Sequence, residues 1–190
     1  MTQRVFVDAN ILMSKTLRDW LYFLREGTGQ AFQLHTTEDV FEEAFYHLRK
    51  KNARLPGHVM QQWRQQIRGA LIQEFVSAFP SDVPFSGADQ EDFHVHAAAL
   101  HGRADILLSN NAPEDFSLDS TPYEVMNADA FLCLAAASVP PTRLRHIVQE
   151  QIAYWSTKPG HRQVDEALIR AGCPNFAQQV RAVIQRLALG

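Results

Sequence analysis

The sequence predicts a three-layer α/β/α sandwich with a short parallel sheet, followed by an all-helical C-terminal extension. Short apolar runs typical of buried strands alternate with longer stretches of helical periodicity, which is the pattern of a parallel sheet covered by helices on both faces. The alternation stops at Pro140-Pro141, and only helical periodicity follows. We therefore expect an α/β domain at residues 1–139 and a helical extension at residues 140–190, as an appendage rather than an independent domain.

Four apolar runs are the expected strands: Arg4–Asp8, Ala31–His35, Asp105–Ser109 and Tyr123–Met126. Helical periodicity places the helices of the domain at residues 10–26, from a Thr36-Thr37 cap to about 51, from 56 to about 79, at 89–101 and at 128–137. In the extension, the same pattern predicts helices at residues 142–155, 164–171 and 175–189.

Composition indicates an ordinary folded protein, with 46% hydrophobic and 21% charged residues in a chain of 190. No apolar stretch is long enough to cross a bilayer, and the N-terminus shows no secretory signal. The two cysteines, Cys133 and Cys173, form no disulfide framework. We therefore expect a cytoplasmic protein with no membrane partner.

The net charge of −3 is unevenly distributed along the chain. Residues 81–129 contain ten acids and one base, whereas residues 141–190 contain seven bases and three acids. An acidic region repels phosphates unless a cation intervenes, so an acidic site beside a basic flank suits a metal-using nuclease. Ordinary surface variation gives the same counts, and charge alone does not decide between the two.

Acidic residues lie where a parallel sheet would make them useful. Asp8 ends the first strand and enters a helix, and the Asp89–Asp92 cluster opens another. Open α/β sheets bind ligands outside the carboxyl ends of their strands, and carboxylates there hold hard cations such as Mg²⁺. The pattern favours metal-dependent phosphate chemistry.

Several stretches of the sequence carry a joint resemblance: Val5–Leu12, Thr37–Glu43, Asp92–Ala99, Ile106–Asn111 with Asp115-Phe116, and Asn127–Leu132. Together they resemble a known family, the PIN-domain nucleases, over roughly residues 3–138. The closest resemblance is to VapC-type toxins of bacterial toxin–antitoxin pairs, in the subgroup with an extra helical C-terminal region.

By this resemblance, Asp8, Glu43 and Asp92 match the three acids that hold Mg²⁺ or Mn²⁺ in the family. The fourth position departs, because many members have an aspartate in a Thr-x-Asp turn where this chain has Ser109-Asn110-Asn111. Asn111 offers an uncharged amide oxygen, and Asp115 could supply the missing carboxylate from the same loop. The departure leaves the occupancy of a second metal open.

The chemistry explains these residue types. A divalent ion activates water and neutralises charge that develops during phosphodiester hydrolysis. Asp8 would be the central ligand, Glu43 would hold a second ion or a water, Asp92 would close the set, and Asn111 or Asp115 would orient water.

Structural roles compete with each assignment. Asp8 is also a typical helix cap, Glu42 is an alternative to Glu43, and Asp89 is the expected cap of the Asp92 helix. A zinc site built on His94, His96 and His101 is disfavoured, because their helical spacing does not gather them and no cysteine lies near in sequence. The Gln61–Arg68 segment has basic and aromatic side chains that suit RNA, although an amphipathic helix explains it better.

The resulting hypothesis is a metal-dependent endoribonuclease toxin with RNA as its substrate. The resemblance also implies a cognate antitoxin that covers the acidic groove, and a homodimer as one assembly to test. Two alternatives stay open: a structure-selective DNA or RNA nuclease outside a toxin–antitoxin system, and a PIN-like binding module whose catalysis is weakened by Asn111.

Overall fold

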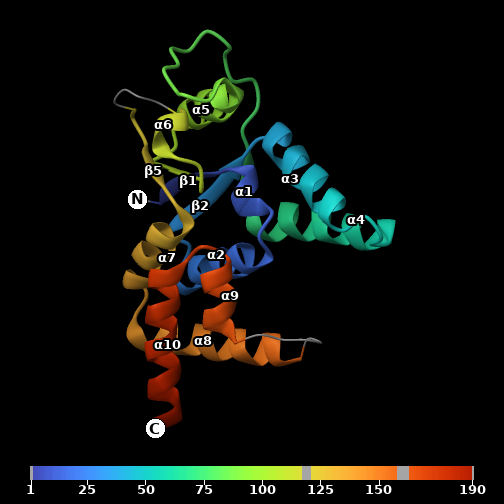
Figure 1. Cartoon of the computed structure of the whole chain (residues 1–190). Coiled ribbons are helices and arrows are strands. Elements are labelled where there is room, and N and C mark those ends of the chain that lie inside the picture. The colour runs from blue at the N-terminus through green and yellow to red at the C-terminus, as the bar shows by residue number, and fades with distance from the viewer. Residues whose placement is uncertain (1, 117–120, 158–162, 190) are drawn as a thin grey trace.

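A computed structural model describes residues 2–116, 121–157 and 163–189, and it contains one five-stranded parallel sheet (Figure 1). Its strands, in the spatial order β3-β2-β1-β4-β5, are Glu74–Phe75, Phe32–Thr36, Gln3–Val7, Ile106–Leu108 and Glu124–Met126. The chain runs outward from β1 through β2 to β3, then returns to the other side of β1 with β4 and β5. The direction of winding therefore reverses between β1 and β4, the position where open α/β sheets bind ligands.

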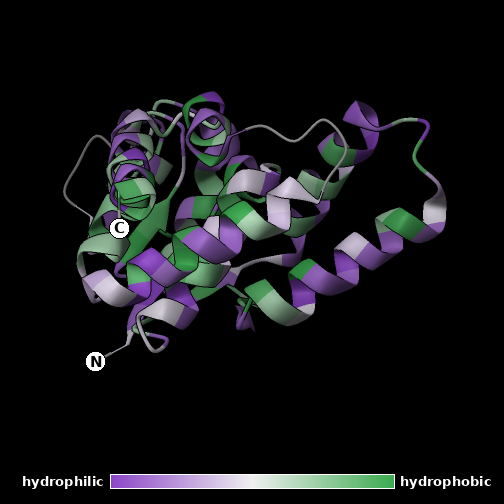
Figure 2. Cartoon of the chain, turned by 90° about the horizontal axis from the view of Figure 1, so that it is seen from below, coloured by the Kyte–Doolittle hydropathy of each residue, from purple (hydrophilic) through white to green (hydrophobic). Residues whose placement is uncertain are grey.

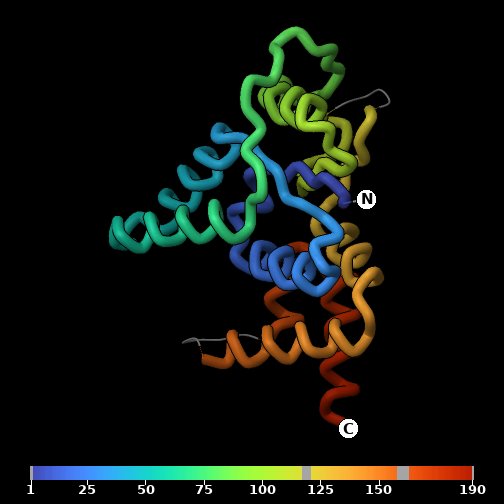
Figure 3. The backbone as a smooth tube through the Cα atoms, turned by 180° about the vertical axis from the view of Figure 1, so that it is seen from behind, coloured from blue at the N-terminus to red at the C-terminus, as the bar shows by residue number. Residues whose placement is uncertain are grey.

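Helices lie on both sides of the sheet, so the predicted layered fold is confirmed. Figures 1 and 3 place α5 and α6 on one side of the sheet and α2 and α7 on the other. The helices of the first part of the chain are α1 (Ala9–Leu12), α2 (Lys15–Gly27), α3 (Glu38–Lys51), α4 (Gly57–Gln66), the 3-10 turn η2 (Gln90–Asp92), α5 (Phe93–His101), α6 (Pro113–Phe116) and α7 (Ala128–Ala137). The helices of the C-terminal extension are α8 (Pro141–Ser156), α9 (Val164–Arg170) and α10 (Pro174–Leu189).

The central strands are buried toward their carboxyl ends. Val5, Phe6 and Val7 of β1 and all three residues of β4 are buried, because helices cover both faces of the sheet. The helices mix hydrophobic and hydrophilic residues along their lengths, as amphipathic helices do (Figure 2). None of the described helices is both long enough and apolar enough to span a bilayer.

The single helix predicted at residues 10–26 is wrong, because the structure divides it into α1 and α2. Ser14 has an extended backbone, and its side chain accepts a hydrogen bond from the Leu17 N–H at 3.3 Å. A serine at this position caps a new helix instead of continuing the old one. The break leaves α1 as a single short helix directly after Asp8.

The long helix predicted from residue 56 to about 79 is also wrong. It ends after α4 and a π-helical segment, η1 (Ile67–Leu71), and the chain then becomes strand β3. The Gln73 backbone N–H donates to the Leu34 carbonyl at 2.9 Å, and the Gln73 side chain accepts from the Leu34 N–H at 2.7 Å. The backbone groups at the edge of β2 therefore bind Gln73 and the residues after it, which form a strand instead of continuing the helix. Pairing with β2 overrides the local helix propensity.

The C-terminal extension packs against α2 and α7 and shares the hydrophobic core of the domain. Trp20 of α2 meets Phe176 of α10 edge to face, with ring centroids 4.9 Å apart. The buried Asp129 carboxylate, in the first turn of α7, accepts hydrogen bonds from the Phe176 N–H at 2.8 Å and the Asn175 N–H at 3.2 Å. A side chain of α7 thus caps α10 from outside its own helix.

Replacing Asp129 by alanine removes the acceptor for the first N–H groups of α10. We expect the free energy of unfolding, measured with urea by circular dichroism, to fall by about 1–2 kcal/mol, as for other lost helix caps. Glu166→Ala is the matched control, because this exposed acid in the first turn of α9 should contribute less than about 0.5 kcal/mol. Equal losses in the two variants would contradict the capping role.

Candidate active site

Asp8 lies at the carboxyl end of β1, where β1 pairs with β4. Val7 is in register with Leu108, so the next residues, Asp8 and Ser109, lie side by side beyond the strands. Asp8 is only 4% exposed. A carboxylate at this depth needs hydrogen-bond partners, and the surrounding residues supply them.

Three hydrogen bonds fix the Asp8 carboxylate. Its Oδ1 accepts from the Ala9 N–H at 2.6 Å, which makes Asp8 the cap of α1. Its Oδ2 accepts from Ser109 Oγ at 2.6 Å and from Asn10 Nδ2 at 2.7 Å. A carboxylate has about four acceptor positions, so one remains available to a cation. The capping and ligand roles of Asp8 are therefore compatible.

A chain of amides joins Asp8 to Asp92. Asn10 Nδ2, which donates to Asp8, also lies 3.0 Å from Asn111 Oδ1. Asn111 Nδ2 in turn donates to Asp92 Oδ2 at 3.1 Å. The structure thus brings together Asp8, Asn111 and Asp92, three residues from separate parts of the sequence.

Asp92 is held in an unfavourable environment for a charged carboxylate. Burial is the largest cause, and it raises the pKa of Asp92 to about 6, with further increases from the charges of Asp8, Asp89 and Asp115. The hydrogen bond from Asn111 opposes the shift only in part. Asp115, which accepts from the Ala112 N–H at 3.1 Å, is therefore close enough to act on Asp92 through its charge.

Asp89 has the structural role expected of it. Its side chain accepts from the Glu91 N–H at 2.9 Å and caps the 3-10 turn that precedes α5. Asp92 makes no such cap hydrogen bond at the start of α5. Its carboxylate therefore remains available to the site.

Glu42 and Glu43 interact with different groups. Glu42 forms an ion pair with Arg64 of α4, including a 2.8 Å contact from Arg64 Nη2 to Glu42 Oε2. Glu43 instead lies near Asp8, where its charge contributes to the raised pKa of the Asp8 carboxylate. Of the two, Glu43 is the one positioned to act with Asp8.

Two of the three histidines considered for a zinc site have other partners. His96 is buried, with Nδ1 2.6 Å from the Tyr123 hydroxyl and Nε2 3.1 Å from the Pro84 carbonyl, and burial lowers its pKa. His94 Nδ1 lies 2.8 Å from the Glu91 carbonyl, so it carries the proton and donates. Within the described residues, no group of three or more His, Cys, Asp or Glu side chains lies close enough together to hold a metal ion.

The donor chemistry nevertheless fits a hard divalent cation. Asp8, Asp92 and Asn111 offer only oxygens to such an ion, which is the preference of Mg²⁺ and Mn²⁺. Burial is the main cause that raises the pKa of both Asp8 and Asp92, and the negative charge of Asp8 adds to the shift at Asp92. A cation between them would relieve this cost.

Two polar residues in the site received no role from the sequence. Asn10 and Ser109 both donate to Asp8, and the Ser109 hydroxyl also accepts from the Asn111 N–H at 3.1 Å. The available signal was their position, because each follows the end of one of two neighbouring strands. Their types gave no such signal, since serine and asparagine are common in any turn.

The fold and these residues define an α/β protein with clustered carboxylates at the switch point of its sheet. The PIN domain family matches residues 4–112, more than half of the chain, so the chain belongs to the PIN domain family. PIN domains are generally nucleases, and they typically use divalent metals. The matched region includes Asp8, Glu43, Asp92 and Asn111 and ends before Asp115. No curated protein and no solved structure matches the chain.

The raised pKa of Asp92 predicts that removing its charge stabilises the folded protein, and that this stabilisation depends on pH. Without metal, in EDTA, the charged form of Asp92 is disfavoured in the folded protein, so the protein loses stability as the pH rises from about 4, and this loss is complete above about 6. We expect Asp92→Asn to raise the free energy of unfolding by on the order of 1 kcal/mol at pH 7.5, after allowance for solvent screening, and to have little effect at pH 4. Urea unfolding at the two pH values measures this, and an equal gain at both would contradict the electrostatic cause.

Proposed function

We propose that this chain is a metal-dependent endoribonuclease that hydrolyses RNA phosphodiesters and acts as the toxin of a bacterial type II toxin–antitoxin pair. The observation that carries the proposal is the hydrogen-bonded connection from Asp8 through Asn10 and Asn111 to Asp92, in a chain of the PIN domain family. It gathers hard oxygen donors at the end of a parallel sheet, where a phosphodiester can approach from solvent.

The metal ligands in this proposal are Asp8, Glu43, Asp92 and Asp115. When bound, Mg²⁺ or Mn²⁺ supplies positive charge to the phosphate and lowers the pKa of water. Ser109 and Asn10 hold the Asp8 carboxylate in one orientation and leave it an acceptor position for a cation. Asn111 orients Asp92 through Nδ2, and its own amide oxygen accepts from Asn10. Such fixed orientation reduces the reorganisation needed during the reaction.

The RNA substrate and the toxin role rest on different support. An exposed phosphodiester in single-stranded or loop RNA is the kind that a surface site can reach. The toxin role rests on the resemblance to VapC-type toxins, including the helical extension after the domain. In this role we propose a cognate antitoxin that covers the acidic site, a homodimer as the assembly, and a cytoplasmic location.

A weakened binding module is the second candidate, and Asn111 favours it. The amide removes a negative charge from the place where relatives carry an aspartate, which lowers attraction for a second cation. Calorimetric titration with Mn²⁺ separates the two candidates: the nuclease binds Mn²⁺ and loses this binding in Asp8→Asn, whereas the inert module gives no heat at millimolar metal. A structure-selective nuclease would instead cleave matched RNA and DNA substrates equally.

Removal of the Asp8 charge tests the nuclease. We expect Asp8→Asn and Asp92→Asn each to lower the rate of cleavage of a labelled single-stranded RNA in Mg²⁺ or Mn²⁺ by more than about 100-fold, because each removes a proposed ligand. Asp105→Asn is the matched control, since it makes the same chemical change at an exposed residue just before β4, at the end of the strand opposite to the site. Comparable rates in all three variants would contradict the assignment.

The same variants examine the toxin role when the gene is induced in a bacterial host. The native chain should arrest growth, and Asp8→Asn should not. Arrest of equal strength by both would mean that the harm is unrelated to hydrolysis.

Glu43 and Glu42 provide a neighbouring pair for a second test. We expect Glu43→Gln to lower RNA cleavage by about tenfold or more, because it withdraws a charge near Asp8. Glu42→Gln should retain cleavage and lose only its exposed ion pair with Arg64, worth less than about 1 kcal/mol of unfolding free energy. Initial rates at saturating Mn²⁺ measure the difference, and the opposite ranking would transfer the role to Glu42.

A further inference from the structure

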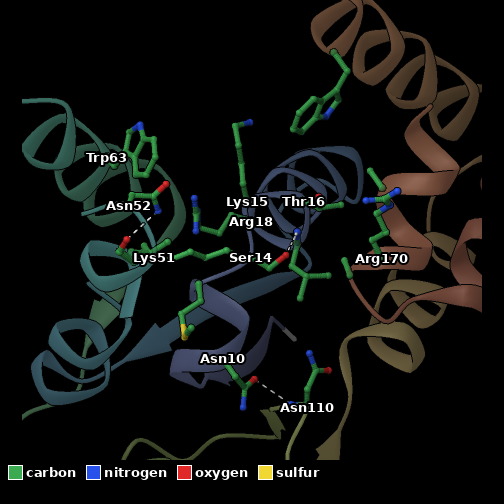
Figure 4. Close-up of a pocket in the computed structure, with 16 residues that line it drawn as sticks. Asn10, Ser14, Lys15, Thr16, Arg18, Lys51, Asn52, Trp63, Asn110 and Arg170 are labelled. Carbon is green, nitrogen blue, oxygen red and sulfur yellow. Dashed lines mark hydrogen bonds between the residues drawn. The ribbon is translucent and has the colours of Figure 1, made fainter. Parts of the chain in front are cut away.

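A cavity of about 590 Å³ opens beside the candidate active site, between α2, the α3–α4 region and helices α8 and α9 of the extension. Asn10 and Asn110 lie together at one end of it, with Trp63 and Arg170 on different sides (Figure 4). The Asn110 N–H donates to Asn10 Oδ1 at 3.1 Å, and Asn10 also donates to Asp8. Asn10 therefore links the cavity to the carboxylate site.

The lining of the cavity is basic. Lys15, Arg18, Lys51 and Arg170 line it, and among its described lining residues there is no aspartate or glutamate. Lys15 has a carboxylate partner, Asp19, at 2.6 Å. Lys51 and Arg170 are exposed, and neither forms an ion pair within the part of the chain that the structure describes. These two cations are available to phosphates, next to an acidic site that by itself repels them.

Two tryptophans also line the cavity, Trp63 from α4 and Trp155 from α8. Trp155 is held in place, because its Nε1 donates to Gln151 at 3.2 Å and the Lys15 ammonium lies 4.4 Å from its ring centroid. Both rings are partly exposed. Aromatic faces beside cations are the usual means of binding single-stranded nucleic acid, because unpaired bases stack on the rings while the cations contact the backbone.

The arginines near Trp63 are not available in the same way. Arg64 and Arg68 form ion pairs with Glu42 and Glu38. Their guanidinium groups also lie over phenylalanine rings, at 4.7 Å for Arg64 on Phe45. Of the basic and aromatic side chains in the Gln61–Arg68 segment, Trp63 is the one that faces the cavity, so contact with RNA is assigned to the cavity rather than to the whole helix.

We infer that the C-terminal extension completes a binding groove for single-stranded RNA: Arg170 with Lys51 contacts phosphates, and Trp155 with Trp63 stacks on bases of the strand that enters the site at Asn10. This inference rests on the proposed ribonuclease function, and it gives the extension a part in substrate binding. Stacking needs unpaired bases, so the groove selects single strands over duplexes.

The test is the affinity of the full chain for a fluorescent 12-nucleotide oligouridine, measured by anisotropy in EDTA so that metal-dependent cleavage does not occur. We expect the double variant Lys51→Gln/Arg170→Gln to bind about tenfold more weakly at 100 mM salt. The slope of log affinity against log salt should fall in magnitude by about 1.4, since each phosphate that is no longer neutralised accounts for about 0.7. The matched control is Lys50→Gln/Arg143→Gln, which removes two exposed cations from α3 and α8 outside the cavity and should bind as the native chain does.

Two further measurements complete the test. Trp63→Leu should lower the affinity by about tenfold, because one stacking surface is removed. An oligouridine–oligoadenine RNA duplex should bind the native chain at least about tenfold more weakly than the single strand. Equal affinity of the two double variants, or preference for the duplex, overturns the inference.

The outcomes separate this inference from the proposed function. If the chain cleaves RNA but its binding does not depend on Lys51, Arg170 or Trp63, the nuclease proposal is supported and the groove is rejected. If binding depends on these residues but no cleavage occurs in Mg²⁺ or Mn²⁺, the groove is supported and the nuclease proposal is rejected.

Discussion

The parallel pairing of β1 with β4 sets the position of the polar groups at the centre of the candidate site. It places Asp8 beside Ser109, and the segments that follow these two strands then carry Asn10 of α1 and Asn111 to within hydrogen-bond distance of each other. Because helices cover both faces of these strands, a slip of register would disrupt the packing of their apolar side chains and separate these polar groups. The hydrophobic core therefore determines the geometry of the charged site.

The electrostatic consequence of this arrangement is a group of carboxylates held at a cost. Asp8 is buried and Asp92 partly so, and each lies near other acids, so both have raised pKa values. Natural proteins keep such clusters where a ligand offsets the cost. The neutral Asn111 reduces the repulsion, and its amide hydrogens hold Asp92, which an aspartate at the same position would not do.

The sequence was informative where burial alone decides the structure. Apolar runs around Phe6 and Leu107 and the helical periodicity from Ala128 were sufficient to predict two central strands and a helix. Strand β3 could not be predicted, because its two residues become a strand only through the edge of β2. The break at Ser14 depends likewise on the role of its side chain as the cap of α2, which periodicity does not report.

The residues of the candidate site likewise fall into those that the sequence predicts and those that it does not. Asp8, Asp92 and Asn111 lie near strand or helix ends, where sequence patterns point to function, and the structure brings them together. The roles of Asn10 and Ser109 depend on hydrogen bonds between segments about 100 residues apart. The approach of Trp155 and Arg170 to Trp63 depends on how the extension packs against α2, and no local pattern encodes that packing.

The first turn of α7 touches both halves of the molecule. The N–H of Ala128 donates to Asn110, in the loop that carries Asn111, while the next residue, Asp129, caps α10. Two consecutive residues thus join the loop of the site to the last helix of the chain. The packing of the last helix and the placement of the loop beside the carboxylates therefore depend on the same turn of α7.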